Sequence, residues 1–299
     1  MSAQPQARPS ELQAWILAAR PKTLPAVTAA VVAGCGAALA EGVFRPLLAL
    51  AALGIGLLLQ IGANLANDYF DYFKGADTPE RLGPLRVTAS GLLTPAQVRQ
   101  GMIVVFGTAG LLGAGLALSA GWPALLAGVA AILAAIVYSG GPRPYGYHGL
   151  GDLAVFIFFG PVAVCGTHFV QAGRLSWLAL AASLPMGFLI TALLVVNNLR
   201  DIPTDRAAGK RTLAVLLGRR GAIAEYLALL AGAYLVPSAM IALGLASGRV
   251  LYAWLTLPYA YRQVRIVLAE EGRSLNQALA GTSQLALYYA VLFSVGIIF

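Results

Sequence analysis

Charged side chains are scarce in this sequence: Asp, Glu, Lys and Arg supply 11% of its 299 residues, whereas hydrophobic residues supply 59%. Soluble domains contain roughly 25% charged residues. The composition therefore excludes an ordinary water-soluble protein and predicts an integral membrane protein. Apolar runs recur along the whole chain, so no second, water-soluble domain is expected.

Cysteine and histidine are nearly absent, with two residues of each type. Cys35 and Cys165 both lie within apolar runs and are interpreted as small core residues, which excludes a disulfide pair and a zinc site. The residues up to Ala18 contain no hydrophobic core followed by a small-residue cleavage site, as a signal peptide would. We therefore expect an N-terminal cytoplasmic tail over residues 1–19 and a single transmembrane domain over residues 20–299.

Nine apolar runs are long enough to approach the thickness of a bilayer. Only helices and closed barrels satisfy backbone polar groups in lipid, and runs of this length without alternation exclude a barrel. The sequence thus predicts an all-α integral membrane bundle of about nine transmembrane helices. The expected segments are residues 23–41, 46–66, 102–120, 122–139, 153–171, 175–196, 222–245, 250–268 and 279–299.

Positively charged residues fall mostly into alternate loops. If the N-terminus is cytoplasmic, 17 of the 20 Lys and Arg residues lie on the cytoplasmic side, and Arg45, Arg174 and Arg249 lie on the opposite side. Cytoplasmic loops of membrane proteins are enriched in Lys and Arg, so this bias predicts a cytoplasmic N-terminus. Topology also accounts for much of the net charge of +8, so no nucleic-acid partner is expected.

The second apolar run ends in an unusual cluster of acidic and amide side chains. Asn64, Asn67, Asp68 and Asp71 fall within an arc of roughly 100° on a helix. A glycine four residues after Asp71 is expected to stop the helix. The chain beyond it would then let Asp77 fold back toward the cluster from a loop.

The sixth apolar run ends in a similar cluster, with Asn197, Asp201 and Asp205 at intervals of four residues. Each such step advances about 40° around a helix, so the three side chains point to nearly the same side. Polar groups at membrane depth are costly, which marks such a cluster as a functional site. Two clusters at equivalent places predict a divalent-metal site built from two halves of the chain, on the cytoplasmic side.

Carboxylate and amide oxygens without neighbouring His or Cys are hard ligands that suit Mg²⁺. Interleaved Lys and Arg residues would complete a cage around a diphosphate, because Mg²⁺ commonly bridges carboxylates to phosphate groups. The alternative is a set of ordinary polar residues at helix ends, but seven carboxylates and amides at helical spacing exceed what an interface requires. The predicted metal ligands are Asn67, Asp68, Asp71, Asp77, Asn197, Asp201 and Asp205.

Three other polar segments are expected on the same side of the membrane. Lys22 could reach a phosphate or serve as an interface anchor. A Gly- and Pro-rich turn contains Arg143, Tyr147 and His148, and His148 could act on an aromatic substrate or make a structural hydrogen bond. The segment Arg81–Gly91 could cap the first cluster and exclude water, or form a solvated loop.

Two motifs, Asn67-x-x-x-Asp71 and Asn197-x-x-x-Asp201-x-x-x-Asp205, resemble those of the UbiA superfamily of intramembrane prenyltransferases. Further stretches are similar to the branch that prenylates 1,4-dihydroxy-2-naphthoate. The likeness runs from Arg20 to the C-terminus. These stretches are ARPKTLPA, NLANDYFDYFKGADTPERLGPLRVTASGLL, SGGPRPYGYHGLGD with VFIFFG, NNLRDIPTDRAAGKRTLAVLLG and LNQALAGTSQLALYY.

The resemblance implies a UbiA-type fold, a reaction and a set of residue roles. A polyprenyl diphosphate would bind through Mg²⁺ held by the two motifs and ionise to an allylic cation. The ring of 1,4-dihydroxy-2-naphthoate would attack this cation with loss of CO₂, giving demethylmenaquinone. Asp77 would replace a third aspartate of the family's first motif, where this chain has Gly75. The residues expected in catalysis are Asp71, Asp201, Asp205 and Lys74, and those expected to bind substrate are Lys22, Arg81, Arg86, Arg143, Tyr147, His148, Arg206 and Lys210. Among them, Arg143 is expected to bind the anionic acceptor, because it is the only cation in its turn.

The expected location is the cytoplasmic (inner) membrane, in contact with lipid and with the active site facing the cytoplasm. Two alternatives remain open on the sequence alone. A related prenyltransferase could use 4-hydroxybenzoate, homogentisate or a porphyrin, and only the acceptor-side stretches argue against it. A secondary transporter would place its charges near the midplane, whereas these carboxylates close apolar runs among basic residues. Prenyl length, oligomeric state, and the choice between menaquinone and phylloquinone are left open.

Overall fold

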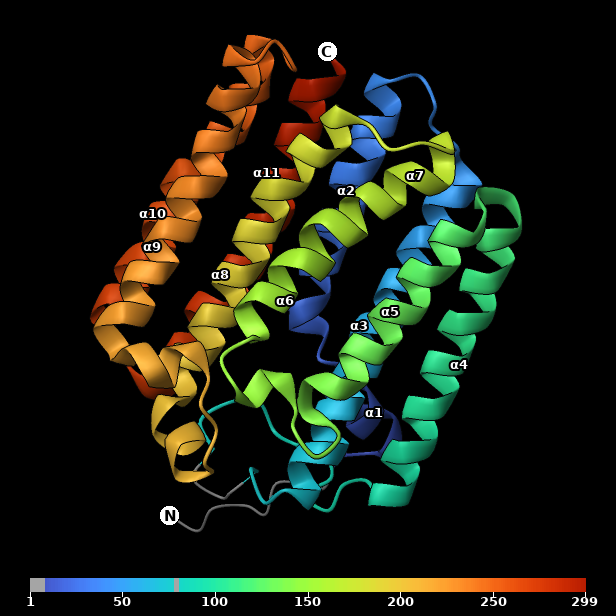
Figure 1. Cartoon of the computed structure of the whole chain (residues 1–299). Coiled ribbons are helices and arrows are strands. Elements are labelled where there is room, and N and C mark those ends of the chain that lie inside the picture. The colour runs from blue at the N-terminus through green and yellow to red at the C-terminus, as the bar shows by residue number, and fades with distance from the viewer. Residues whose placement is uncertain (1–8, 78–80) are drawn as a thin grey trace.

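The structure, a computed structural model, describes residues 9–77 and 81–299, and every regular element in this part of the chain is a helix. Most of the helices run along one elongated bundle (Figure 1). The all-α prediction is confirmed. The elements are α1 (Glu11–Ala19), η1 (Pro21–Thr23), α2 (Leu24–Ala40), α3 (Pro46–Phe73), α4 (Pro95–Ala120), α5 (Trp122–Ser139), η2 (Tyr145–Tyr147), α6 (Gly151–Ile157), η3 (Phe158–Cys165), α7 (Gly166–Ala172), α8 (Trp177–Ala207), α9 (Leu213–Ala242), η4 (Gly248–Thr256), α10 (Leu257–Ala269), η5 (Gly272–Ser274) and α11 (Leu275–Ile298).

Eight helices within the described ranges are long and apolar enough to cross a membrane, close to the expected number of about nine. The remaining expected segment, residues 250–268, is built differently. The 3₁₀ helix η4 leads directly into α10, and the pair runs beside α9 (Figure 1). Helix α10 has only 13 residues and carries Arg262 and Arg265, so by itself it is too short and too charged for a continuous span.

Several helices extend beyond the apolar runs that predicted them. Helix α3 continues to Phe73, and the extension carries the first polar cluster. It stops as predicted, because Gly75 adopts a left-handed φ of 65° that glycine accepts without a steric penalty. Helix α4 begins at Pro95, where Thr94 supplies a capping box. Apolar runs alone therefore underestimate the length of these helices, because the helices continue into polar residues at their ends.

The N-terminal segment that was expected to be a tail contains helix α1. Ser10 caps this helix, and Ala14 and Ala18 are buried in one apolar cluster with residues of α3 and α4. Trp15 packs against Gly101 of α4, where a Cβ would lie 2.7 Å from the indole ring. Helix α1 therefore docks onto the bundle, because Ala14, Trp15 and Ala18 pack against apolar residues of α3 and α4.

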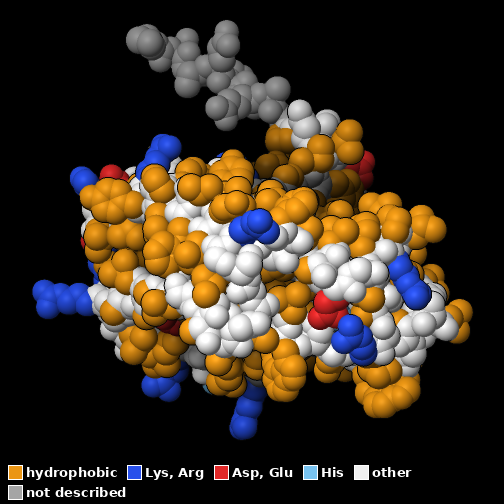
Figure 2. All heavy atoms as spheres, turned by 90° about the horizontal axis from the view of Figure 1, so that it is seen from above, with side chains coloured by type: hydrophobic (Ala, Val, Ile, Leu, Met, Phe, Trp, Pro, Cys, Tyr) orange, Lys and Arg blue, Asp and Glu red, His pale blue; other side chains and the backbone are white. Residues whose placement is uncertain are grey.

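The two ends of the bundle differ in charge. Helix α1 and the C-terminal ends of α3 and α8 lie at one end, and the C-terminus of the chain lies at the other (Figure 1). Arg45, Arg174 and Arg249 share the C-terminal end, as predicted: Arg174 pairs with Glu41 at 2.8 Å, and Arg249 Nη1 donates to the carbonyl oxygen of Phe299. Figure 2 shows that this end carries mostly apolar and uncharged side chains with isolated charges.

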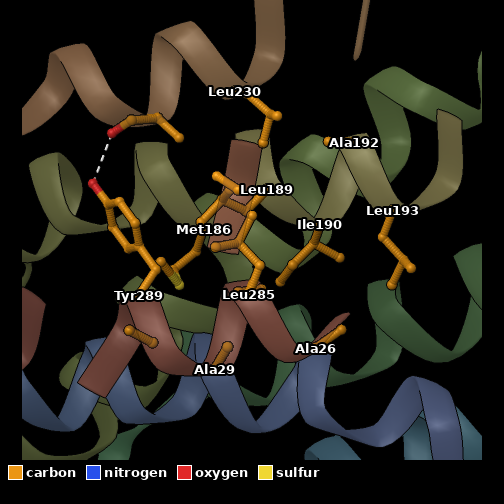
Figure 3. Packing of buried hydrophobic residues seen from close by; sticks show 14 of the residues in the cluster. Ala26, Ala29, Met186, Leu189, Ile190, Ala192, Leu193, Leu230, Leu285 and Tyr289 are labelled. Atoms are coloured by element: carbon orange, nitrogen blue, oxygen red, sulfur yellow. Dashed lines mark hydrogen bonds between the residues drawn. The ribbon is translucent and has the colours of Figure 1, made fainter. Parts of the chain in front are cut away.

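The main apolar core lies where α8 packs against α2, α9 and α11 (Figure 3). Met186 and Leu189 of α8 are fully buried, beside Leu230 of α9, Leu285 of α11 and Ala29 of α2. Small residues along α2 let the helix backbones approach closely, as is common in membrane bundles. Helix α8 is thereby held on several sides, which fixes the position of the second polar cluster at its end.

A proline in α9 leaves one backbone carbonyl of the core without its helical donor. Pro237 has no N–H, so the carbonyl oxygen of Ala233, four residues earlier, cannot accept the usual bond. The hydroxyl of Tyr289 on α11 donates to this oxygen at 2.7 Å, as the dashed line in Figure 3 shows. Lipid offers no substitute donor, so Tyr289 satisfies a group that the proline exposes.

Replacing Tyr289 with phenylalanine is therefore expected to destabilise the bundle by about 1 kcal/mol, because the Ala233 carbonyl loses its donor. Thermal unfolding of the purified protein in detergent measures the effect as a lower melting temperature. Tyr288→Phe is the matched control, since Tyr288 is 47% exposed and its hydroxyl makes no hydrogen bond to a described residue. Equal melting temperatures for the two variants would contradict this account of Pro237.

Candidate active site

A cavity of about 570 Å³ lies among α2, α3, α5, α8 and the segment from α6 to α7. Along α3 its lining runs from Ala52 in the apolar part to Asp71 in the polar part, roughly 28 Å at 1.5 Å per residue. Both predicted clusters face this cavity, so two distant parts of the chain form one site. Its principal polar side chains are Arg20, Asn64, Asn67, Asp71, Arg81, Arg86, Tyr147, Asn197, Asn198, Asp201, Asp205 and Lys210.

Asp71 is the centre of the first cluster and has three donors. It accepts hydrogen bonds from the Tyr147 hydroxyl at 2.6 Å, Arg86 Nη2 at 3.0 Å and Lys210 Nζ at 3.3 Å. Lys210 Nζ also lies 3.8 Å from Asp205 Oδ1, which links the two clusters. Burial raises the pKa of Tyr147, and the neighbouring Asp71 carboxylate raises it further, so the phenol stays protonated and remains a donor.

The second cluster is held by a buried arginine. Arg200 is 1% exposed and donates through Nε and Nη2 to the two oxygens of Asp201, at 2.8 and 2.5 Å. Its Nη2 also lies 2.9 Å from Asn197 Oδ1, and its Nη1 lies 2.7 Å from Asn276 Oδ1 on α11. A two-bond contact of this kind fixes both distance and orientation. The sequence indicated Arg200 only as part of the positive charge bias, so this role was missed.

The loop that follows the first cluster, residues 81–94, is called the cap loop below. Asp68 accepts the backbone N–H groups of Val87 and Thr88, at 3.1 and 3.0 Å. The prediction that this segment covers the first cluster is therefore confirmed. Asp68 was predicted as a metal ligand, but both of its oxygens face the loop backbone and it does not line the cavity. In this structure it anchors the cap loop.

Asp77 was also predicted as a metal ligand and lies outside the cavity lining. Its Oδ1 accepts from Arg81 Nη1 at 2.8 Å and from Arg86 Nε at 3.2 Å. Burial raises the pKa of Asp77 to about 7, and nearby Arg81 opposes this shift. Asp77 therefore orients two arginines that do line the cavity, instead of facing it directly.

Five residues that the sequence assigned to the site are exposed and absent from the cavity lining. Lys74 Nζ instead donates to the carbonyl oxygens of Ser139 and Gly141, at 2.7 and 3.0 Å. His148 Nδ1 lies 2.9 Å from the Pro144 carbonyl oxygen, which supports the structural alternative. Helical periodicity predicts where side chains point on a helix but not in a turn, and four of these five residues lie outside the long helices. The five residues are Lys22, Lys74, Arg143, His148 and Arg206.

Arg20, two residues before the predicted Lys22, is the cation that reaches the cavity instead. It has a left-handed φ of 52°, the one non-glycine residue with positive φ within the described ranges. Its guanidinium makes no hydrogen bond to a described residue, and its Nη2 is buried. Asn64 Nδ2 donates to the Ala19 carbonyl oxygen at 3.0 Å and holds the turn. A strained backbone and a half-buried guanidinium with an unpartnered buried nitrogen beside a cavity indicate an anion-binding position.

The donor set of the cavity fits Mg²⁺. Its carboxylates and amides are oxygen ligands, and neither histidine lines it. Within residues 9–77 and 81–299, no three Asp, Glu, His or Cys side chains cluster closely enough to hold an ion by themselves. This agrees with Mg²⁺ chemistry, since the ion usually takes one or two carboxylates and completes its shell with water and substrate phosphates. The residues that would hold it are Asn67, Asp71, Asn197, Asp201 and Asp205.

Fold and cavity together define a helical membrane protein with paired carboxylate motifs at one end of a long apolar cavity. The sequence matches the UbiA prenyltransferase family over residues 27–294. It is 41% identical over 300 residues to 1,4-dihydroxy-2-naphthoate octaprenyltransferase of Escherichia coli (strain K12), covering 96% of each chain. It is 49% identical over 207 residues to the protein of that name from Mycobacterium tuberculosis, covering 68% of this chain and 70% of the relative. The chain belongs to the UbiA prenyltransferase family.

Solved structures show the same fold. A UbiA homologue from Archaeoglobus fulgidus bound to DMAPP and Mg²⁺ superposes with a TM-score of 0.69 at 14% identity, covering 95% of this chain and 98% of that one. A UbiA homologue from Aeropyrum pernix K1 gives a TM-score of 0.69 at 20% identity, covering 91% and 96%. The expected UbiA-type fold is therefore confirmed.

Proposed function

We propose that this chain transfers a polyprenyl group from a polyprenyl diphosphate to 1,4-dihydroxy-2-naphthoate, with loss of CO₂, to give demethylmenaquinone. The observation that carries the proposal is a cavity whose polar end joins both carboxylate motifs and whose remaining wall is apolar. Such a shape suits a substrate with a diphosphate head and a long hydrocarbon tail. The acceptor is supported by the names of the similar bacterial proteins.

The polar end binds the diphosphate. Mg²⁺, when bound at the two motifs, would neutralise the phosphate oxygens and stabilise charge on the leaving group. Arg81, Arg86 and Lys210 of this chain supply further positive charge, and their contacts with Asp71 and Asp77 orient them before substrate arrives. Preoriented charges stabilise developing charge without reorganisation at the moment of reaction.

The apolar wall protects the allylic cation that the departing diphosphate leaves behind. Aromatic and aliphatic side chains such as Phe158, Phe159 and Leu59 line this part, so the prenyl tail contacts apolar groups only. The cap loop covers the polar end of the cavity and is fixed there by its hydrogen bonds to Asp68. Excluding water from both parts favours capture of the cation by the aromatic ring over hydrolysis.

The acceptor is an anion, and Arg20 is the cation best placed to bind its carboxylate. The other cations of the polar end already face carboxylates, namely Arg81 and Arg86 at Asp77, and Lys210 at Asp71. Arg20 instead presents its guanidinium to the cavity without a partner among the described residues. This assignment replaces Arg143, which lies exposed outside the lining.

An acceptor panel tests the proposed function. Membranes containing the protein are supplied with Mg²⁺, prenyl diphosphates of several lengths and either 1,4-dihydroxy-2-naphthoate or 4-hydroxybenzoate. We expect prenylated product from the naphthoate. Turnover of 4-hydroxybenzoate alone would refute the naphthoate acceptor but would leave the prenyl transfer chemistry standing. Movement of one of these compounds across the membrane without any prenylated product would favour a transporter.

The polar end of the cavity is proposed to face the cytoplasm, in the inner membrane of a bacterium. This follows from the charge difference between the ends of the bundle, because positive loops remain in the cytoplasm. Alkaline phosphatase fused after Phe299 should therefore be active, and green fluorescent protein at the same position should be dark. A fusion at the N-terminus should show the reverse pattern. A fluorescent fusion after Phe299 would contradict the orientation.

A further inference from the structure

Asn276 lies in the first turn of α11, outside both carboxylate motifs, and its amide connects two parts of the site. Its Oδ1 accepts from Arg200 Nη1 at 2.7 Å, and its Nδ2 donates to the Leu82 carbonyl oxygen at 3.2 Å. Arg200 in turn donates to both oxygens of Asp201. An unbroken series of hydrogen bonds therefore runs from the cap loop to the second motif.

The bridging position requires an amide. A guanidinium only donates and a backbone carbonyl only accepts, so the side chain between them needs one acceptor and one donor. Aspartate at position 276 would keep the bond to Arg200 but would face the Leu82 carbonyl without a proton. Alanine would lose both bonds and leave one nitrogen of the buried Arg200 unpartnered, which is costly.

The cap loop also rests directly on Arg200. A Cβ on Gly83 would lie 2.7 Å from Arg200 Nη2, so a side chain at this position would displace the guanidinium from its partners. On its other side the loop is fixed to the first motif, because Asp68 accepts two of its backbone N–H groups and Arg86 contacts Asp71. The cap loop thus contacts the first motif directly and the second through Arg200.

We propose that Asn276 is a positioning residue that holds the cap loop closed over the diphosphate end of the cavity and keeps Arg200 aligned with Asp201. The inference rests on the proposed function, because it assigns Asn276 to the diphosphate half of that reaction. Arg20, assigned to the acceptor, takes no part in this series of hydrogen bonds. The two substrates should therefore respond differently to a change at Asn276.

Kinetics test this difference. Asn276→Ala is expected to raise the KM for the prenyl diphosphate, and the Mg²⁺ concentration for half-maximal rate, by roughly tenfold to a hundredfold, since bonds to a charged group are lost. The acceptor KM should change by less than about twofold. Asn276→Asp keeps the contact with Arg200, so its KM for the prenyl diphosphate should lie between those of the wild type and Asn276→Ala. Gln277→Ala, at the exposed neighbour in the same turn, is the control and should behave as wild type.

A second readout does not depend on turnover. Thr88 is 4% exposed within the cap loop, and it is replaced by cysteine in a chain carrying Cys35→Ala and Cys165→Ala. The rate of maleimide labelling in proteoliposomes then reports opening of the loop. Adding Asn276→Ala should accelerate labelling by roughly tenfold, because local opening becomes easier. Adding Gln277→Ala should leave the rate unchanged.

Faster labelling together with a selective rise in the diphosphate KM supports the proposal. Unchanged labelling would overturn it, and so would an equal rise in both KM values, which would indicate a general loss of stability. If the wild-type chain fails to prenylate the naphthoate, the proposed function fails. The labelling rates would still decide whether Asn276 holds the cap loop.

Discussion

Replacing Asp71, Asp201 or Asp205 with asparagine is expected to reduce kcat by on the order of a hundredfold to a thousandfold, while the protein still inserts and folds. Asparagine keeps the size and one oxygen of the side chain but removes the negative charge that a cation bridging to diphosphate requires. The three residues line one cavity from two helices, so each substitution weakens the same substrate complex. Initial rates with purified protein in proteoliposomes measure the effect.

The matched control is Glu225→Gln, which neutralises a half-buried carboxylate on α9 that does not line the cavity. This variant should retain the wild-type rate. EDTA should abolish turnover of the wild-type protein, and added Mg²⁺ should restore it. Full activity of Asp201→Asn, or turnover that resists EDTA, would refute a metal site built from two motifs.

Replacing Arg20 with alanine is expected to raise the KM for the naphthoate acceptor by roughly tenfold to a hundredfold, because a hydrogen bond between charged groups is lost. The KM for the prenyl diphosphate should change far less, since Arg81, Arg86 and Lys210 remain at the polar end. Arg20→Lys keeps the charge but not the planar pair of donors, so it should recover only part of the loss.

Arg143→Ala is the matched control for this experiment, because Arg143 is an exposed cation at the same end of the bundle. It should leave both KM values near those of wild type. A large rise in the acceptor KM for Arg143→Ala but not for Arg20→Ala would restore the assignment drawn from the sequence. A rise confined to the diphosphate KM in Arg20→Ala would assign Arg20 to the other substrate.

Helical periodicity explains what could be predicted from the sequence. Asp71, Asp201 and Asp205 belong to long apolar helices, where spacing alone determines which side chains share a face. The two polar clusters were then expected to lie together, because ionisable side chains at membrane depth are stabilised by polar or charged partners. Residues of both motifs line one cavity in the structure, which is the arrangement that this reasoning expects.

Residues in turns and in non-local contacts could not be predicted in this way. The choice between Arg20 and Lys22 depends on a left-handed backbone conformation at Arg20 that the sequence does not specify. Helical spacing places Asp68 on the same face as Asn64 and Asp71. Its carboxylate nevertheless contacts the cap loop, because that loop presents two backbone N–H groups to it. Asn276 lies far along the chain from Arg200, and only the packing of α11 beside α8 brings them together.

Decarboxylative prenylation is tested directly by following both the ring and the carboxyl carbon of the acceptor. Purified protein in proteoliposomes receives Mg²⁺, a polyprenyl diphosphate and 1,4-dihydroxy-2-naphthoate labelled at the carboxyl carbon. We expect a prenylated product without label, labelled CO₂ in equal amount, and loss of both when EDTA is added. A prenylated product that keeps the label, or no product with any prenyl diphosphate, would contradict it.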